Sequence, residues 1–346
     1  MSYFRIWWEQ ITGPMKFLNA IKRRIDEDET CTFLFVPDRD KLPWDKELRE
    51  TLIGDHIPDS RKFNIFDDAA IGNGISEFLL ERFATKEQLL KCNLRPVDAA
   101  VDDFLIQNGI LDDKIIWVKN ISDIKKWKKH LFPKYNKKTS GNSVIFILET
   151  DDCSIADDKE AGVIKYPDCV SEYDIHLFAS LVAAESRNEP ELRRYITFVA
   201  ENLCGFNVKT LVSFISDNNF KSMNIVETFT NRYKTEDDDW RKIERRLWRA
   251  QLQAAFPVIE EERTKFVNKY FEVLWTFVPD LEGVEEPYDI ELGKLVFLLG
   301  TRELIIEDRQ ERDRVYLLQQ LRNKLAHLKY CDAGEMYELL SGSKVK

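Results

Sequence analysis

The residues with the clearest chemical potential lie near the C-terminus, in the segment Leu321–Leu328. Arg322, Asn323 and His327 fall there within a stretch of six residues. A histidine titrates near neutral pH, so it can take or give a proton as a general base or acid. An arginine can hold a phosphate group and stabilise developing negative charge. The segment therefore combines a proton-transfer group with an anion-binding group.

An amphipathic helix is the element that must position these side chains. Apolar residues recur at three- and four-residue steps and so occupy one helical face: Val315, Leu318, Leu321, Leu325 and Leu328. We predict a helix over 309–327, on which Asn323 lies one turn before His327 and can orient its imidazole. A purely structural interpretation stays open, because the C-terminal turn of a helix also favours cations such as Arg and His.

The pattern Arg322-Asn323-Lys324-Leu325-Ala326-His327 is an R-x4-H motif with a polar residue after the arginine. Residues 238–346, in which it lies, resemble a HEPN domain, an all-helical module of prokaryotic toxins and immunity proteins. The resemblance implies metal-independent cleavage of RNA, with Arg322 and His327 catalytic and Asn323 supporting. It also implies a homodimer that pairs this helix across a two-fold axis. Non-catalytic relatives that only dimerise or dock are the alternative.

The first half of the chain alternates short apolar runs with helical patterns. Five runs are typical of strands buried on both faces, at about 31–37, 63–66, 115–118, 144–149 and 162–166. Strands separated by helices predict an α/β domain with a five-stranded parallel sheet. Beyond about Glu172 only helical patterns follow. We therefore expect an α/β domain at 1–170, a small helical lid at 171–232 and an all-α helical bundle at 238–346.

Five strands followed by a helical lid resemble the AAA+/STAND type of P-loop ATPase in layout. The family's phosphate loop would fall at 37–44, but this segment contains no glycine, two aspartates and two prolines. Aspartates repel phosphate, and prolines have no amide hydrogen to donate. Glu149, Asp151 and Asp152 are carboxylates of the kind that hold magnesium, but without a phosphate loop we interpret them as a loop rim. We expect a degenerate domain that serves as a scaffold or sensor.

A basic helix precedes the fourth predicted strand. Four lysines surround Trp127, namely Lys125, Lys126, Lys128 and Lys129. Lysines contact phosphate and an aromatic ring can stack on a base, which predicts an RNA-binding edge. The alternative is an exposed helix face with Trp127 and Phe132 turned into the core.

Bulk composition narrows the class of protein. The 346-residue chain has a formal net charge of −10, which argues against a general nucleic-acid coat. Six scattered cysteines without a CxxC pair, and no early apolar leader, favour a reduced, cytoplasmic protein. The four histidines do not pair at ligand spacing, and no apolar run reaches membrane-spanning length. We expect no metal, no cofactor and no membrane partner.

Together these patterns favour an endoribonuclease of a prokaryotic anti-phage or toxin system, regulated by the degenerate ATPase-like domain. Two alternatives stay open. One is a non-catalytic adaptor that docks on a larger partner of a defence complex through both domains. The other is a switch that binds ATP without a standard phosphate loop.

Overall fold

A parallel sheet forms the centre of the first half of the chain, as predicted. In a computed structural model, its strands are β1 (Cys31–Phe35), β2 (Lys62–Asp67), β3 (Lys114–Lys119), β4 (Ile145–Thr150) and β5 (Val163–Lys165). All neighbouring strands pair in parallel, in the order β2-β3-β4-β1-β5. Phe33 of β1, for example, is in register with Leu148 of β4. The strand bounds lie close to those expected from the apolar runs, because strands buried on both faces are apolar throughout.

The structure describes residues 3–57, 61–72, 74–95, 100–135, 144–157, 162–186, 188–221, 224–233 and 239–341. The chain divides into two units, Met1–Asp174 (unit 1) and Ile175–Lys346 (unit 2). Among the described residues, no helix is both long and apolar enough to cross a membrane.

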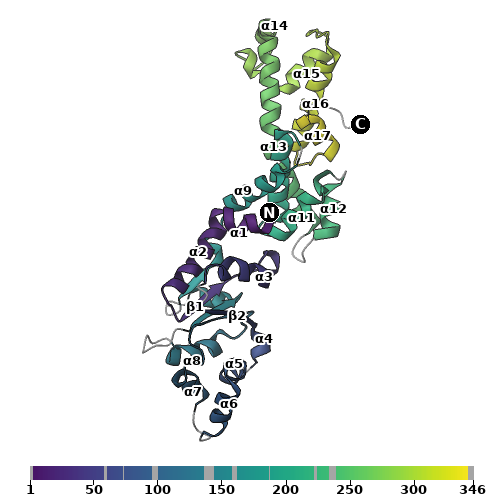
Figure 1. Ribbon diagram of the computed structural model, residues 1–346. Helices are drawn as coiled ribbons and strands as arrows, with labels where there is room; N and C mark the ends of the chain where they lie inside the picture. The colour runs from purple at the N-terminus through teal and green to yellow at the C-terminus, as the bar shows by residue number, and fades with distance from the viewer. Residues whose placement is uncertain are drawn as a thin grey trace. The chain divides into compact units, whose positions relative to one another are not determined.

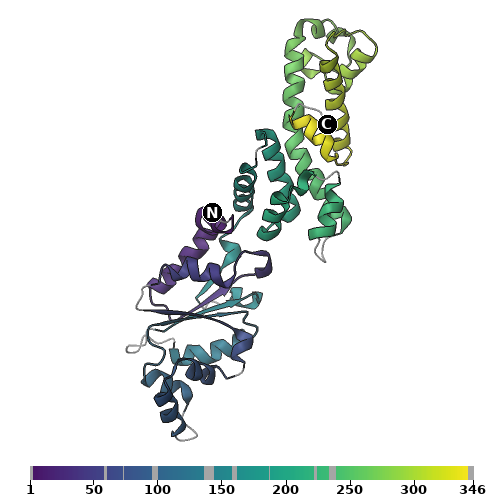
Figure 2. The same cartoon turned by 45° about the vertical axis from the view of Figure 1, so that its right-hand side comes forward.

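Helices cover both faces of the sheet in unit 1 (Figures 1 and 2). One face carries α1 (Tyr3–Gln10), α2 (Thr12–Asp26) and α3 (Lys46–Arg49). The other carries α4 (Asp68–Ile71), α5 (Ile75–Phe83), α6 (Lys86–Asn93), α7 (Val101–Gln107) and α8 (Ile124–Tyr135). On this second face Phe33, Phe146 and Leu148 pack against apolar residues of α5, α7 and α8. Burial on both sides is what a parallel sheet requires.

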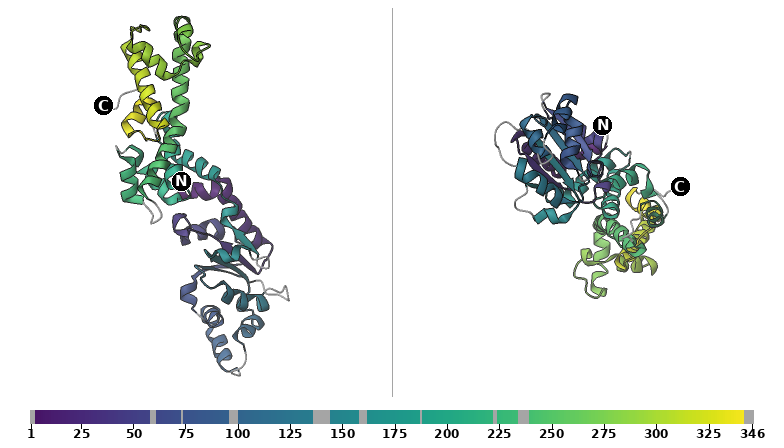
Figure 3. Two further views of the ribbon diagram at one scale, coloured as in Figure 1. Left: turned by 180° about the vertical axis from the view of Figure 1, so that it is seen from behind. Right: turned by 90° about the horizontal axis from the view of Figure 1, so that it is seen from below.

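Unit 2 is entirely helical within the described residues. It contains α9 (Glu172–Ala184, which begins in unit 1), α10 (Pro190–Cys204), α11 (Val208–Ser216), α12 (Ile225–Tyr233), α13 (Trp240–Lys269), α14 (Phe271–Trp275), α15 (Leu292–Gly300), α16 (Arg309–Ala326) and α17 (Ala333–Ser341). The long α13 lies beside α16 and α17 (Figure 3). It also packs along α10, so helices on both sides of the acidic segment 236–239 belong to one unit.

Some local features of the helices were not apparent from the sequence. The helix α2 begins at Thr12, and the preceding Ile11 provides no side-chain cap. The helices α1 and α6 were not predicted, because each is only eight residues long. The start expected for the helix over 97–107 lies outside the described residues, and α7 is assigned from Val101. Pro257 lies inside α13, which continues as a helix on both sides of it.

Candidate functional site

The helix α16 presents the predicted motif at its C-terminal end. It begins at Asp308, whose side chain accepts hydrogen bonds from the backbone amides of Gln310 (2.8 Å) and Glu311 (3.3 Å). These bonds satisfy two amides that have no partner within the helix. The buried face carries Val315, Leu318, Leu321 and Leu325, as predicted.

The end of α16 departs from the predicted apolar stripe. His327 is the C-cap, and Leu328 adopts a left-handed conformation with φ of 59°. The Lys329 amide then donates to the Lys324 carbonyl (3.0 Å), and the Leu328 amide to the Leu325 carbonyl (3.2 Å). This is a Schellman arrangement, in which glycine is the usual left-handed residue. Because the chain turns here, Leu328 leaves the apolar face and is 71% exposed, contrary to the prediction.

Two side chains of α13 hold this end in place. The Trp248 indole donates to the backbone carbonyl of Leu325 (2.7 Å), an oxygen near the helix terminus. Gln251 is fully buried and bonds both backbone groups of Cys331: its amide nitrogen donates to the carbonyl (2.8 Å) and its oxygen accepts from the amide (2.7 Å). The segment that carries the motif is therefore fixed by α13.

The three predicted catalytic residues are accessible, but they do not form one cluster. The Arg322 side chain is 41% exposed, and its nearest carboxylate is that of Glu291 at 3.9 Å. His327 is exposed, and its backbone amide bonds the Asn323 carbonyl (3.1 Å); no side-chain hydrogen bond between the two is recorded. Five residues at roughly 100° each separate Arg322 from His327 by about 140° around the helix axis. One helix alone thus points them in different directions.

Burial and a raised pKa argue against a thiol nucleophile at Cys331. The side chain is only 1% exposed, and burial, with the nearby Glu335 carboxylate, raises the pKa of the thiol to about 12. The reactive form of a cysteine is the thiolate. At neutral pH Cys331 is a protonated core residue.

In unit 1, the crevice where an open parallel sheet usually binds ligands is filled by side chains. Such crevices lie at the carboxyl ends of neighbouring strands whose connections leave in opposite directions. Here those strands are β1 and β4, which are neighbours in the sheet. The chain leaves β1 toward β2 at one edge of the sheet, and it leaves β4 toward β5 at the opposite edge.

Glu149, near the end of β4, is fully buried at this crevice. It accepts hydrogen bonds from the Arg49 guanidinium (2.7 and 3.1 Å) and from the indoles of Trp44 (3.2 Å) and Trp117 (2.9 Å). Arg39, in the loop after β1, pairs with Asp151 (2.8 Å). Of the carboxylates that we weighed as magnesium ligands, Glu149 and Asp151 are thus paired with arginines, and Asp152 accepts from the backbone amide of Ser154 (2.8 Å). Among the described residues, no three His, Cys, Asp or Glu side chains cluster as metal ligands would.

The predicted basic edge on α8 keeps only part of its surface. Trp127 is fully buried and its indole donates to Asp68 (2.9 Å), so it is unavailable for stacking. Lys126 bonds the carbonyl of Gly72, and Lys128 lies 5.4 Å from the Phe132 ring centre. Lys125 and Lys129 are exposed. RNA binding at α8 remains a prediction that rests on lysines alone.

A buried polar cluster lies beneath α8. Asp102 of α7 is 2% exposed and accepts from Ser76 (2.8 Å) and Tyr135 (3.3 Å). Burial opposes its ionisation, but the His130 imidazole at 3.3 Å and the hydrogen bond from Lys134 outweigh this and hold the pKa of Asp102 well below its usual range. An activated serine needs a hydrogen bond from its hydroxyl to a base such as histidine. The Ser76 hydroxyl instead donates to the Asp102 carboxylate, so Ser76, His130 and Asp102 are not arranged as a catalytic triad. We interpret the cluster as structural.

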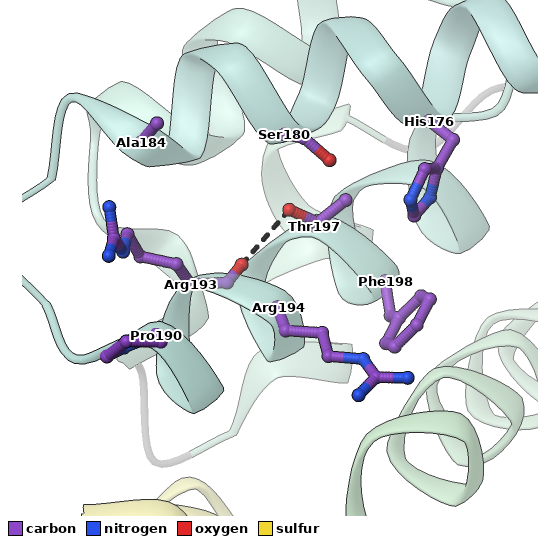
Figure 4. Close-up of a pocket in the computed structure, with 8 residues that line it drawn as sticks. All are labelled: His176, Ser180, Ala184, Pro190, Arg193, Arg194, Thr197 and Phe198. Atoms are coloured by element: carbon purple, nitrogen blue, oxygen red, sulfur yellow. Dashed lines mark hydrogen bonds between the residues drawn. The ribbon is translucent and has the colours of Figure 1, made fainter.

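A pocket of about 440 Å³ lies between α9 and α10. Figure 4 shows the side chains that line it. Its polar groups are largely engaged within the protein. His176 contacts Glu201 (2.6 Å), the Thr197 hydroxyl donates to the Arg193 carbonyl (3.0 Å), and Arg194 lies over the Phe198 ring. Because these groups do not converge on a common point, we assign no ligand to this pocket.

Sequence reasoning did not single out the face of α13 that lies beside the end of α16. Arg241, Arg245 and Trp248 follow one another at steps of four and three, which places them on one side of a helix. This helical spacing is the sequence pattern from which the shared face could have been predicted. No protein-family model matches the sequence, and no curated protein is significantly similar to it. Any functional assignment therefore rests on the geometry of the chain itself.

Proposed function

We propose that the chain is a metal-independent endoribonuclease of the HEPN type, with its catalytic residues at the end of α16. Arg322 and His327 are the catalytic residues of this proposal, and Asn323 supports them. The substrate is single-stranded RNA.

The observation that carries the proposal is the accessibility of this polar group on a helix that is otherwise anchored in a core. Leu321 and Leu325 are fully buried, whereas Arg322 is 41% exposed and His327 is exposed. The ion pair of Arg322 with Glu291 is long, at 3.9 Å, and exposed pairs of this kind contribute little. Arg322 can therefore exchange this partner for a phosphate at small cost.

The proposed chemistry needs only groups of the protein and the RNA. His327 takes the proton of the 2′-hydroxyl, and the 2′-oxygen attacks the adjacent phosphorus. The bond from phosphorus to the 5′-oxygen breaks, and that oxygen receives a proton from a second acid. Arg322 stabilises the extra charge of the pentacoordinate phosphate. The products are a 2′,3′-cyclic phosphate and a 5′-hydroxyl end.

A second copy of the chain completes this site. Because Arg322 and His327 diverge by about 140° on one helix, a single copy does not direct both at one phosphate. Pairing two α16 helices across a two-fold axis brings His327 of one copy toward Arg322 of the other. The second histidine is then available as the acid.

Unit 1 takes the role of a scaffold or sensor in this proposal. Its layout resembles an AAA+/STAND ATPase, but the crevice between β1 and β4 holds the Glu149–Arg49 pair and two indoles. A ribonuclease fused to such a unit suits a prokaryotic anti-phage or toxin system, in which unit 1 restrains or positions the nuclease.

The test is cleavage of a labelled single-stranded RNA in the presence of EDTA. We expect wild-type protein to leave 2′,3′-cyclic phosphate ends. His327→Ala should lower the rate by at least about 100-fold, the usual contribution of a general acid or base. Arg322→Ala should lower it by about 100- to 1,000-fold.

His176→Ala is the matched control, because His176 is another exposed histidine of unit 2. It should leave the rate unchanged. No cleavage by the wild-type protein, together with a larger protein that co-purifies with it, would support the adaptor alternative instead. Equal rates for wild type and His327→Ala would remove His327 from the catalytic assignment.

A further inference from the structure

A second pocket lies directly beside the end of α16. It has a volume of about 470 Å³. Arg241, Arg245 and Trp248 of α13 line one side, and Leu328, Lys329 and Tyr330, which follow α16, line the other. Leu328 is bonded to His327, and consecutive Cα atoms are about 3.8 Å apart. The pocket therefore begins at the residue after the proposed catalytic histidine.

The lining combines positive charge with aromatic surface. Arg241, Arg245 and Lys329 are exposed cations, and Glu244 is the one acidic residue among the lining residues. Within the described part of the chain, Arg245 and Lys329 form no ion pair. In a protein with a net charge of −10, this is a local excess of positive charge. The pocket therefore attracts anions, although the protein as a whole is negatively charged and repels them.

One of the two aromatic side chains of the pocket is held in place by a hydrogen bond. The Trp248 indole is fixed by its hydrogen bond to the Leu325 carbonyl (2.7 Å). Burial and the Glu244 carboxylate raise the pKa of Tyr330, so its phenol stays neutral at physiological pH. Fixed aromatic rings lose little freedom when a planar ligand stacks on them.

Leu328 is an unusual residue for its position at the end of a helix. It has a left-handed backbone with φ of 59°, where glycine is favoured, and its side chain is 71% exposed. A strained, exposed apolar residue is an observation that calls for a functional explanation. Its place on the pocket wall supplies one, because it adds apolar surface beside Trp248 and Tyr330.

We propose that this pocket, which we call the α13 subsite, binds one nucleotide of a single-stranded RNA next to the scissile phosphate. A base stacks on Trp248 and Tyr330 against Leu328, while Arg241, Arg245 and Lys329 contact the phosphates. Single-stranded RNA fits because stacking on side chains requires an unpaired base. The inference deepens the proposed function and rests on it for the position of the cleaved bond.

The test separates binding from cleavage. All variants carry His327→Ala, which keeps the RNA intact, and binding of a fluorescein-labelled oligouridine ten-mer is measured by fluorescence anisotropy. We expect Arg245→Gln to weaken binding about tenfold. It should also reduce the slope of log K against log salt by about 0.7, the value for one phosphate contact to a single strand.

Three further substitutions keep the test valid if one variant folds poorly. Trp248→Leu should weaken binding about tenfold, whereas Trp248→Phe, which loses the same hydrogen bond but keeps a ring, should retain most of the affinity. Leu328→Gly should weaken binding without lowering the thermal stability, because glycine accepts the left-handed backbone.

Arg309→Gln is the matched control. Arg309 is 85% exposed at the first turn of α16, about 26 Å along the helix from its end, so removal of its charge should leave binding unchanged. Equal affinities for the His327→Ala parent, Arg245→Gln and Trp248→Leu, or no binding by the parent, would overturn the subsite. Binding that depends on the pocket, in a protein whose wild type cleaves no RNA, would support the subsite and overturn the ribonuclease.

Discussion

The Trp248 indole nitrogen lies 2.7 Å from the Leu325 carbonyl oxygen and donates to it across 77 positions of sequence. This bond joins α13 to the last turn of α16, where carbonyls have no partner within the helix. The same tryptophan lines the pocket beside His327. One side chain thus links the support of the helix end to the surface that we propose for RNA.

Loss of this bond should loosen the end of α16. We predict that Trp248→Phe lowers the free energy of unfolding by about 1 kcal/mol, the net contribution of one hydrogen bond. Hydrogen exchange at the amides of Leu328 and Lys329 should become faster, because they bond carbonyls in the same turn. Unchanged exchange at both amides would contradict a supporting role for Trp248.

The Glu149 carboxylate should be essential for the stability of unit 1. In Glu149→Gln, Arg49, which is 4% exposed, is left as a buried cation without its counterion. Removal of one partner of such a pair costs about 3–5 kcal/mol. We expect this loss in urea denaturation, with exchange increased in β3 and β4. Glu87→Gln, at an exposed ion pair of the same unit, should have no measurable effect.

ATP should not stabilise the protein. The crevice between β1 and β4 is filled by Trp44, Arg49 and Glu149, and the loop after β1 contains no glycine. A ligand at 100 times its Kd would add about 2.7 kcal/mol to the free energy of unfolding. We predict no change of Tm with millimolar ATP and magnesium. A clear rise of Tm would favour the nucleotide switch.

Asp102 should contribute stability that depends on pH. Its pKa is lower in the folded protein than in the unfolded chain, so its contribution is present above the unfolded value of about 3.9 and is lost as the pH falls toward the folded value. Asp102→Asn should therefore destabilise unit 1 at pH 7, and the difference from wild type should shrink below about pH 4. Urea denaturation at several pH values measures this. A difference that stays constant down to pH 3 would assign the effect to packing.

The Cys331 thiol should resist alkylation in the folded protein. Its pKa of about 12 leaves almost no thiolate at pH 8, and the side chain is 1% exposed. Iodoacetamide followed by peptide mapping should modify the exposed Cys153 much faster. Cys331→Ala should cleave RNA as wild type does. A fast reaction at Cys331 would reopen the thiol alternative.

The sequence by itself determined the five strands and most of the buried face of α16. The apolar runs predicted all five strands, and the three- and four-residue steps in α16 identified Leu321 and Leu325 as buried. These features follow from backbone sterics and local periodicity, which a linear pattern contains. The position of Arg322 and His327 near the end of a helix could also be predicted from the local sequence.

Only the tertiary structure decided what these elements bring together. Glu149 meets Arg49 across 100 positions, which turns an expected loop rim into a buried ion pair. Trp127 turns inward to Asp68, 59 positions away, which removes the stacking residue from the basic helix. Trp248 reaches Leu325, and the pocket beside His327 forms between two separate segments. Contacts at such separations depend on the topology and on the packing of whole helices, which local periodicity does not contain.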